Sequence, residues 1–131
     1  MTALEKAREF FAADRYATEV TGIEIIAVGE HYAKCQLSIE GRHKNAVGHV
    51  MGGVIFTMAD FVFAVAANFG APSPTVTVTS NIAYLASPRG NTLFGEAKLL
   101  KDGRRNCFYE ITITDDLGTT VAIVTTNGAH L

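Results

Sequence analysis

The chain has 131 residues, of which 48% are hydrophobic and 18% are charged, and its formal net charge is −2. This length is typical of one domain, so we expect residues 1–131 to form a single unit. The high apolar content and low net charge exclude an intrinsically disordered chain. A net charge near zero also argues against a nucleic-acid partner, because nucleic-acid binders usually carry a concentrated basic field.

The two cysteines, Cys35 and Cys107, are too few for a disulfide framework and lack the paired spacing of a zinc site. Each lies in a strand-like stretch, so we expect both to be buried free thiols. Residues 1–16 do not resemble a signal peptide, because charged residues occupy the place of its apolar core. These features predict a cytoplasmic protein.

The N-terminal residues 2–14 are predicted to form a short amphipathic helix. Thr2, followed three residues later by Glu5, is the pattern of a helix-capping box. Apolar side chains then recur at helical spacing and define one buried face. These residues are Leu4, Ala7, Phe10 and Phe11.

Two strands and a loop are expected next. Residues 20–28 form an apolar, strand-like stretch, and residues 33–39 alternate apolar and polar side chains with a period of two. A turn at residues 28–31 would join them as a hairpin. Residues 40–51 follow neither period and are predicted to form a loop.

Residues 52–69 are predicted to form a long helix. Gly70, with Pro72 just beyond it, is the signal for the end of this helix. This stretch of 18 residues, with one charge, is at the threshold length of a membrane span. However, Asp60 near the middle would cost about 2.5–3.5 kcal/mol in a bilayer, so we expect a buried helix of a soluble protein and no membrane partner. Because the helix is apolar on every face, it must be enclosed.

The second half of the chain contains four strand-like stretches separated by turn residues, which predicts an antiparallel meander. In the first stretch, apolar residues such as Val76 and Val78 alternate with polar residues such as Thr77 and Thr79. The stretches are residues 75–85, 92–101, 106–114 and 119–131. The simplest packing is an α+β fold in which a curved antiparallel sheet wraps around the long helix. One sheet can hardly cover all sides of that helix, so pairing with a second copy is expected to complete the burial.

Asp60 is the only charged residue of the long helix. A buried carboxylate is costly, so it needs a hydrogen-bond partner, a wet cavity or a raised pKa. One interpretation is an ordinary Asp at a gap in the wrapping sheet. The other is a catalytic base or nucleophile that faces a pocket.

The helix begins with Gly52 and Gly53, whose backbone N–H groups lack intrahelical partners at the positive end of the helix dipole. Such a terminus can hold a carbonyl oxygen as it becomes an oxyanion, although a simple tight turn would also explain the two glycines. Gly52 and Asp60 are eight residues apart, which is about 12 Å along a helix. One helix therefore cannot present both groups to one carbonyl, whereas two antiparallel copies can.

The stretch Asn45–Asn68, followed by Val76–Pro88, resembles the hot-dog-fold acyl-CoA thioesterases, in particular the phenylacetic-acid-degradation (PaaI-like) branch. The resemblance covers residues 20–130 in element order. Its sharpest part is Asn-x-x-Gly-x-x-His-Gly-Gly, with an Asp eight residues after the first paired glycine. This chain departs from the motif at Met51, which stands in place of the histidine.

The resemblance implies hydrolysis of an acyl-CoA thioester at a site shared between the two chains of a dimer, with a dimer of dimers as the expected assembly. Asp60 would activate water or attack the thioester, and the Gly52 N–H would polarise its carbonyl. Asn45 would help to position the water or the carbonyl, and Thr77 would bond near the carboxylate. Coenzyme A would enter only as part of the substrate, with no further cofactor.

Substrate contacts are expected from residues near the helix start, from apolar side chains of the helix and from basic residues near turns. The predicted set is Met51, Gly53, Phe56, Phe61, Arg89 and Arg104. Most of the helix phenylalanines would serve equally well as core, and each arginine as a solvated turn residue. The remaining histidines have no ligand spacing, so no metal site is predicted.

Two alternative functions stay open at this point. Hydratases and dehydratases of the same fold act on the acyl chain, usually with a well-placed histidine that the sequence does not place near Asp60. The other alternative is an acyl-CoA sensor that binds without turnover.

Overall fold

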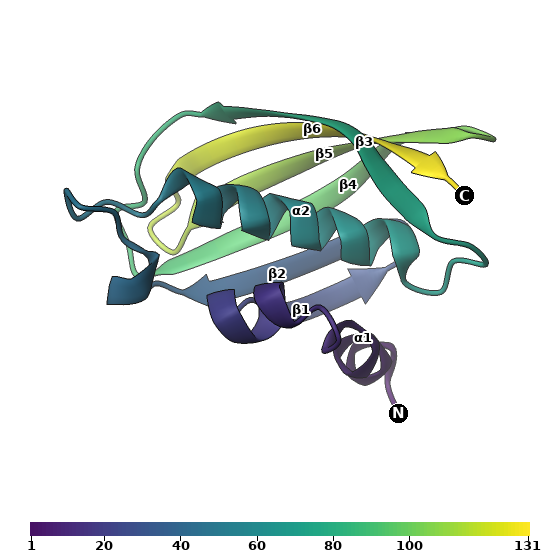
Figure 1. Cartoon of the computed structure of the whole chain (residues 1–131), viewed down its shortest axis with the longest axis horizontal. Coiled ribbons are helices and arrows are strands. Elements are labelled where there is room, and N and C mark those ends of the chain that lie inside the picture. Colours follow the sequence, from purple (N-terminus) through teal and green to yellow (C-terminus); the bar gives the residue numbers. More distant parts are fainter.

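The computed structural model describes residues 1–131 and consists of one six-stranded antiparallel sheet curved around a long helix, α2 (Gly52–Asn68). Figure 1 shows α2 lying across the concave face of the sheet, with the shorter helix α1 (Ala3–Phe11) beside the β1 edge. The strands are β1 (Glu24–Gly29), β2 (Tyr32–Ser38), β3 (Thr75–Tyr84), β4 (Thr92–Asp102), β5 (Asn106–Asp115) and β6 (Thr120–His130). The predicted α+β class is confirmed.

The strand order in the sheet is β1-β2-β4-β5-β6-β3. The β4–β5–β6 meander is confirmed, but the prediction of a continuous four-strand meander is wrong at β3. This strand pairs with β6 at the opposite edge of the sheet, so residues 85–91 form a crossing connection and not a hairpin turn. Side-chain alternation identifies a strand but does not identify its neighbour, and that is why the sequence pattern missed this placement.

The core lies between the concave face of the sheet and α2. Val62 and Phe63 of the helix are fully buried, and the Phe63 ring meets Tyr109 of β5 edge-to-face with ring centroids 5.3 Å apart. At Gly128 of β6 a Cβ would lie 2.9 Å from the Phe63 ring, so glycine is what allows this close approach. Cys35 and Cys107 are buried free thiols as expected, and burial raises the pKa of Cys35 to about 12.

The sheet does not enclose α2 completely. Gly53 and Asp60 are exposed and Thr57 and Ala64 partly so, which together define an open stripe along the helix. These positions are three or four residues apart and therefore share one face. One copy therefore leaves part of the helix uncovered, as expected. No helix of the structure is both long and apolar enough to span a bilayer.

Strand β3 forms an uncovered sheet edge with an irregular register. The pairing with β6 shifts between Thr77 and Thr79, which marks a bulge. Val76 and Val78 are exposed, and Val78 keeps 60% of its surface in solvent. Val76 pairs with Ala129, the residue after Gly128, whose Cβ position faces the Phe63 ring, so Val76 lies on the opposite, outer face of the sheet.

The N-terminal segment differs from its prediction in two places. The capping box of Thr2 and Glu5 is confirmed, but Phe10 is 69% exposed, whereas Phe11 is buried and meets Phe61 of α2 edge-to-face. The predicted strand 20–28 begins only at Glu24. The preceding Tyr16–Thr21 forms a wide helical turn that Gly22 ends in the left-handed conformation, with a φ of 90°.

Asp115 organises the chain where the crossing connection enters β4. One carboxylate oxygen accepts the N–H groups of Arg89 and Gly90 at 2.7 and 3.0 Å, and the other accepts those of Leu117 and Thr119 at 3.0 and 2.8 Å. Burial alone would raise the pKa of Asp115, but these four donors hold it well below its usual value. The sequence indicated only a turn here, because two of the donors that the carboxylate binds, Arg89 and Gly90, are remote in the chain.

Replacing Asp115 with Asn should lower the melting temperature by several degrees, because an amide presents one acceptor oxygen where four N–H groups need two. The carboxylate stabilises the fold when ionised, so its contribution is complete above the unfolded-state pKa of Asp and is lost as the pH falls towards the lower folded-state value. Thermal melts of both proteins from pH 7 to pH 3 test this, and the difference between them should shrink with acidity. A constant difference would contradict the assignment.

Candidate functional site

The N-terminus of α2 presents two free backbone donors. Met51 is the N-cap in extended conformation, and its carbonyl accepts the N–H groups of Val54 at 3.0 Å and Ile55 at 3.4 Å. The N–H groups of Gly52 and Gly53 donate to no protein acceptor, and no side chain caps the helix. Two unpaired donors at the positive end of a helix form an arrangement that binds a carbonyl oxygen or an anion.

The loop before α2 is held in place by its own polar groups. The Asn45 side-chain oxygen accepts the N–H groups of Val47 and His49, both at 3.1 Å, and Lys44 and Val50 form a short bridge. The Asn45 amide nitrogen makes no hydrogen bond within the chain. Asn45 therefore shapes the loop with its oxygen and keeps its N–H₂ group available for a ligand.

His43 anchors the same loop to the body of the protein, and the sequence analysis missed this role. Its ring is buried, with 3% of the residue exposed, and Nδ1 accepts the N–H of Glu40 at 2.9 Å. The ring therefore carries its proton on Nε2, which donates to the Thr21 carbonyl at 2.7 Å. The His43 carbonyl in turn accepts the Met51 N–H at 2.8 Å, directly before the helix.

Asp60 lies on the open stripe of α2 and lines a cavity of about 300 Å³. Phe61 and Ala64 of the helix form part of the wall, and Asp14 and Tyr16 close the side towards the N-terminal segment. Partial burial, and then the negative charge of Asp14, raise the pKa of Asp60. A carboxylate with a raised pKa in an open cavity has the properties of a general base or nucleophile.

The structure places the helix-start group and Asp60 apart within one copy. Gly52 and Asn45 do not line the Asp60 cavity, and Thr77 is exposed on β3 opposite Gly128. Within one chain, then, the predicted catalytic residues form two separate groups.

The predicted substrate residues also lie in separate parts of the structure. Met51 is exposed and Phe56 half-buried at the first turn of α2, while Phe61 is buried beside Asp60. Arg89 lies in the crossing connection, whereas Arg104 lines a cavity of about 480 Å³ at the C-terminal end of α2. The two arginines therefore do not form one basic cluster within a copy.

Comparison with known proteins relates this chain to thioesterases. A family model described as the thioesterase superfamily matches residues 47–122, which includes both the helix start and Asp60. Human acyl-coenzyme A thioesterase 13 is 28% identical over 117 residues, covering 86% of this chain and 78% of its own.

Solved structures show the same fold. The PaaI protein of the phenylacetic acid degradation operon of Escherichia coli superposes with a TM-score of 0.87 at 24% identity, over 99% of this chain and 96% of its own. A Streptococcus mutans protein solved with acetyl-CoA has a TM-score of 0.78 at 24% identity, over 83% of this chain and 88% of its own.

Replacing Asp14 with Asn should lower the pKa of Asp60, because one of the two causes of its upward shift is the neighbouring negative charge. The measurement is an NMR titration of the Asp60 side-chain carboxyl carbon. Glu9→Gln is the matched control, since it removes one exposed carboxylate of α1 that does not line the cavity. An Asp60 titration identical in wild type and Asp14→Asn would contradict the proposed coupling.

Proposed function

This chain belongs to the thioesterase superfamily and is a thioester hydrolase, and we propose that it hydrolyses acyl-CoA thioesters at a site shared between two copies. The observation that carries the proposal is the pair of unpaired N–H groups at Gly52 and Gly53, on the same helix as a single carboxylate in an open cavity. The names of the relatives support the substrate class, since acyl-coenzyme A thioesterase 13 and the thioesterase PaaI match most of the chain. We extend the proposal to the whole of residues 1–131 as one hot-dog thioesterase domain.

In the proposed reaction the thioester carbonyl oxygen accepts the Gly52 N–H of one copy. Asp60 of the other copy removes a proton from water, which attacks the carbonyl carbon and forms a tetrahedral oxyanion held at the helix start. Collapse of this intermediate breaks the C–S bond, and the proton passes to the sulfur of coenzyme A. In the variant route Asp60 attacks directly, and water then opens the mixed anhydride.

Sharing between copies follows from distance. Along α2 the two groups are separated by about 12 Å, whereas a reacting water must lie about 3–3.5 Å from the carbonyl carbon. Two antiparallel helices related by a two-fold axis would bring Gly52 of each to Asp60 of the other. The open stripe of α2, which contains both Gly53 and Asp60, is the surface that such a partner would cover.

The remaining predicted residues keep supporting roles in this proposal. The free amide of Asn45 would position the water or the carbonyl, and Thr77 would bond near the partner's carboxylate. Met51 and Gly53 would contact the thioester at the helix start, while Phe56 and Phe61 would line the acyl group. Arg89 and Arg104 would pair with coenzyme A phosphates, and in a dimer they would come from different copies.

No cofactor beyond the coenzyme A of the substrate enters this scheme. Assembly as a dimer of dimers and a cytoplasmic location stay predictions.

Replacing Asp60 with Asn should lower kcat by about 10²–10⁴-fold, because the base or nucleophile is lost while side-chain size is kept. Thiol release from a panel of acyl-CoA substrates measures the rate, and a melting curve checks that the variant is folded. Unchanged hydrolysis would exclude a role for the carboxylate. A changed double bond without thiol release would instead identify a hydratase, and binding without turnover would identify a sensor.

Sharing of the site is tested by complementation. Gly52→Pro removes the N–H at the first helical position, where proline is well tolerated, and Gly52→Ala is the matched control that adds a Cβ but keeps the N–H. Neither Asp60→Asn nor Gly52→Pro should be active alone. Because an equal mixture of chains is half heterodimers and each heterodimer has one intact site of two, about a quarter of wild-type activity should return. No recovery from purified heterodimers carrying two different tags would contradict a shared site.

A further inference from the structure

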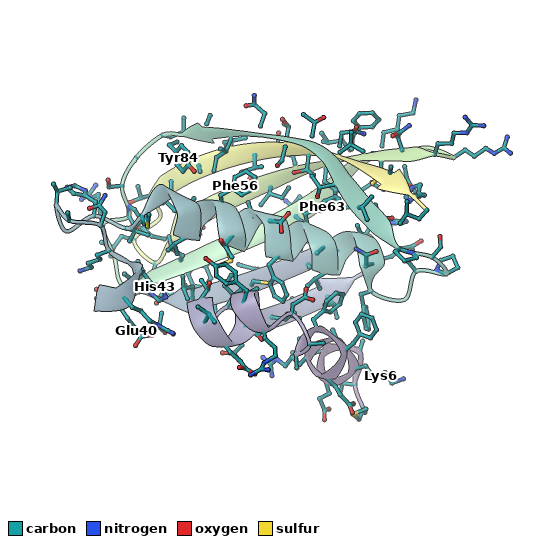
Figure 2. All side chains as sticks on the ribbon, viewed as in Figure 1. Lys6, Glu40, His43, Phe56, Phe63 and Tyr84 are labelled. Atoms are coloured by element: carbon teal, nitrogen blue, oxygen red, sulfur yellow. The ribbon has the colours of Figure 1, made fainter.

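Tyr84, the last residue of β3, reaches across to the start of α2. Its hydroxyl group donates a hydrogen bond to the Gly52 carbonyl oxygen at 2.9 Å. Figure 2 shows the Tyr84 side chain above the N-terminal end of the helix. None of the substrate or catalytic roles described above uses this residue.

The contact is not an ordinary helix cap. At the N-terminus of a helix the unpaired backbone groups are N–H donors, whereas the carbonyls already accept intrahelical bonds. A hydroxyl that donates to the Gly52 carbonyl therefore satisfies none of the orphan groups. It acts instead on the peptide unit between Gly52 and Gly53, whose other end is the unpaired Gly53 N–H.

A hydrogen bond to a peptide carbonyl draws charge towards the oxygen and makes the N–H of the same peptide a stronger donor. It also fixes the plane of that peptide and hence the direction in which the Gly53 N–H points. Both effects act on one of the two donors available to a developing oxyanion. The stabilisation that this N–H gives to the thioester oxygen grows as negative charge develops there. It is therefore larger in the transition state than in the bound substrate.

The residues after Tyr84 hold it in place. The N–H groups of Leu85 and Ala86 both donate to the Val121 carbonyl, at 2.8 and 3.2 Å. The Ser87 hydroxyl lies 3.0 Å from His49 Nδ1, which ties the same segment to the loop before α2. Residues 84–87 thus contact that loop at one point and the first turn of the helix at another.

The Tyr84 side chain also leaves little space beside Gly52. A Cβ built at this position would lie 3.2 Å from the Tyr84 hydroxyl oxygen and 3.3 Å from the ring carbon that bears it. A side chain at residue 52 would require the Tyr84 ring to shift, so glycine at this position leaves the space that the tyrosine occupies.

We propose that Tyr84 is a positioning residue for thioester hydrolysis, which orients and polarises the Gly52–Gly53 peptide so that its N–H assists the Gly52 N–H in holding the oxyanion. This inference rests on the proposed function. It predicts an effect on the chemical step and not on substrate affinity or on folding, because Tyr84 is 52% exposed and a partly exposed hydrogen bond contributes little to stability.

The test is Tyr84→Phe, which keeps the ring and removes the hydroxyl. We expect kcat for acyl-CoA hydrolysis to fall about three- to tenfold, with KM and the melting temperature unchanged. Tyr32→Phe is the matched control, since it removes the hydroxyl of another hydrogen-bonded tyrosine, on β2, whose partner is Glu96. The control should keep wild-type kcat.

A second measurement does not depend on turnover. The backbone amide nitrogen resonance of Gly53 should move in Tyr84→Phe and not in Tyr32→Phe, because the carbonyl of the same peptide loses its donor. Wild-type kcat in Tyr84→Phe, a raised KM with unchanged kcat, or an unmoved Gly53 resonance would each overturn the inference while wild-type hydrolysis upholds the proposed function. A wild-type protein that releases no thiol from any acyl-CoA would instead overturn the proposed function, and the catalytic role of Tyr84 with it.

Discussion

Burial of α2 is the constraint on which the rest of the structure depends. The helix is apolar on nearly all its faces, so the chain must supply an apolar surface large enough to cover it, and the curved sheet provides that surface with Tyr109 and the inner residues of β2, β4 and β6. Burying an unpaired carboxylate is costly, so the single carboxylate of the helix must lie where the sheet does not cover α2. Asp60 therefore lies on the open stripe, in a cavity, and the same packing that excludes water elsewhere raises its pKa.

The sheet topology also determines which residues contact the start of α2. Because β3 runs back along the helix at the opposite edge from β1, its last residue comes to lie beside the first residue of α2. The loop before the helix is fixed from the other side by the buried ring of His43. The two unpaired N–H groups are therefore held by contacts from distant parts of the chain, and the proposed oxyanion site would need this rigidity.

Much of this arrangement could be predicted from the sequence, and the exceptions share one cause. The bounds of α2, the β4–β6 meander and the candidate pair Gly52 and Asp60 follow from local periodicity, from turn residues and from one charge in an apolar helix. The edge position of β3, the Thr21 carbonyl that holds the His43 ring and two of the four donors on Asp115 are set by partners far away in the chain. No local pattern encodes such partners, and for that reason Tyr84 also looked like one more residue of an alternating strand.

The bulge in β3 has a consequence for how this edge meets other chains. An uncovered strand offers a row of backbone donors and acceptors to any extended segment, and long regular edges are prone to indiscriminate pairing. Between Thr77 and Thr79 the pairing of β3 with β6 is shifted, and such a bulge increases the local twist of a strand. A twisted edge is a poorer template for a straight foreign strand, so the bulge protects this edge from indiscriminate pairing.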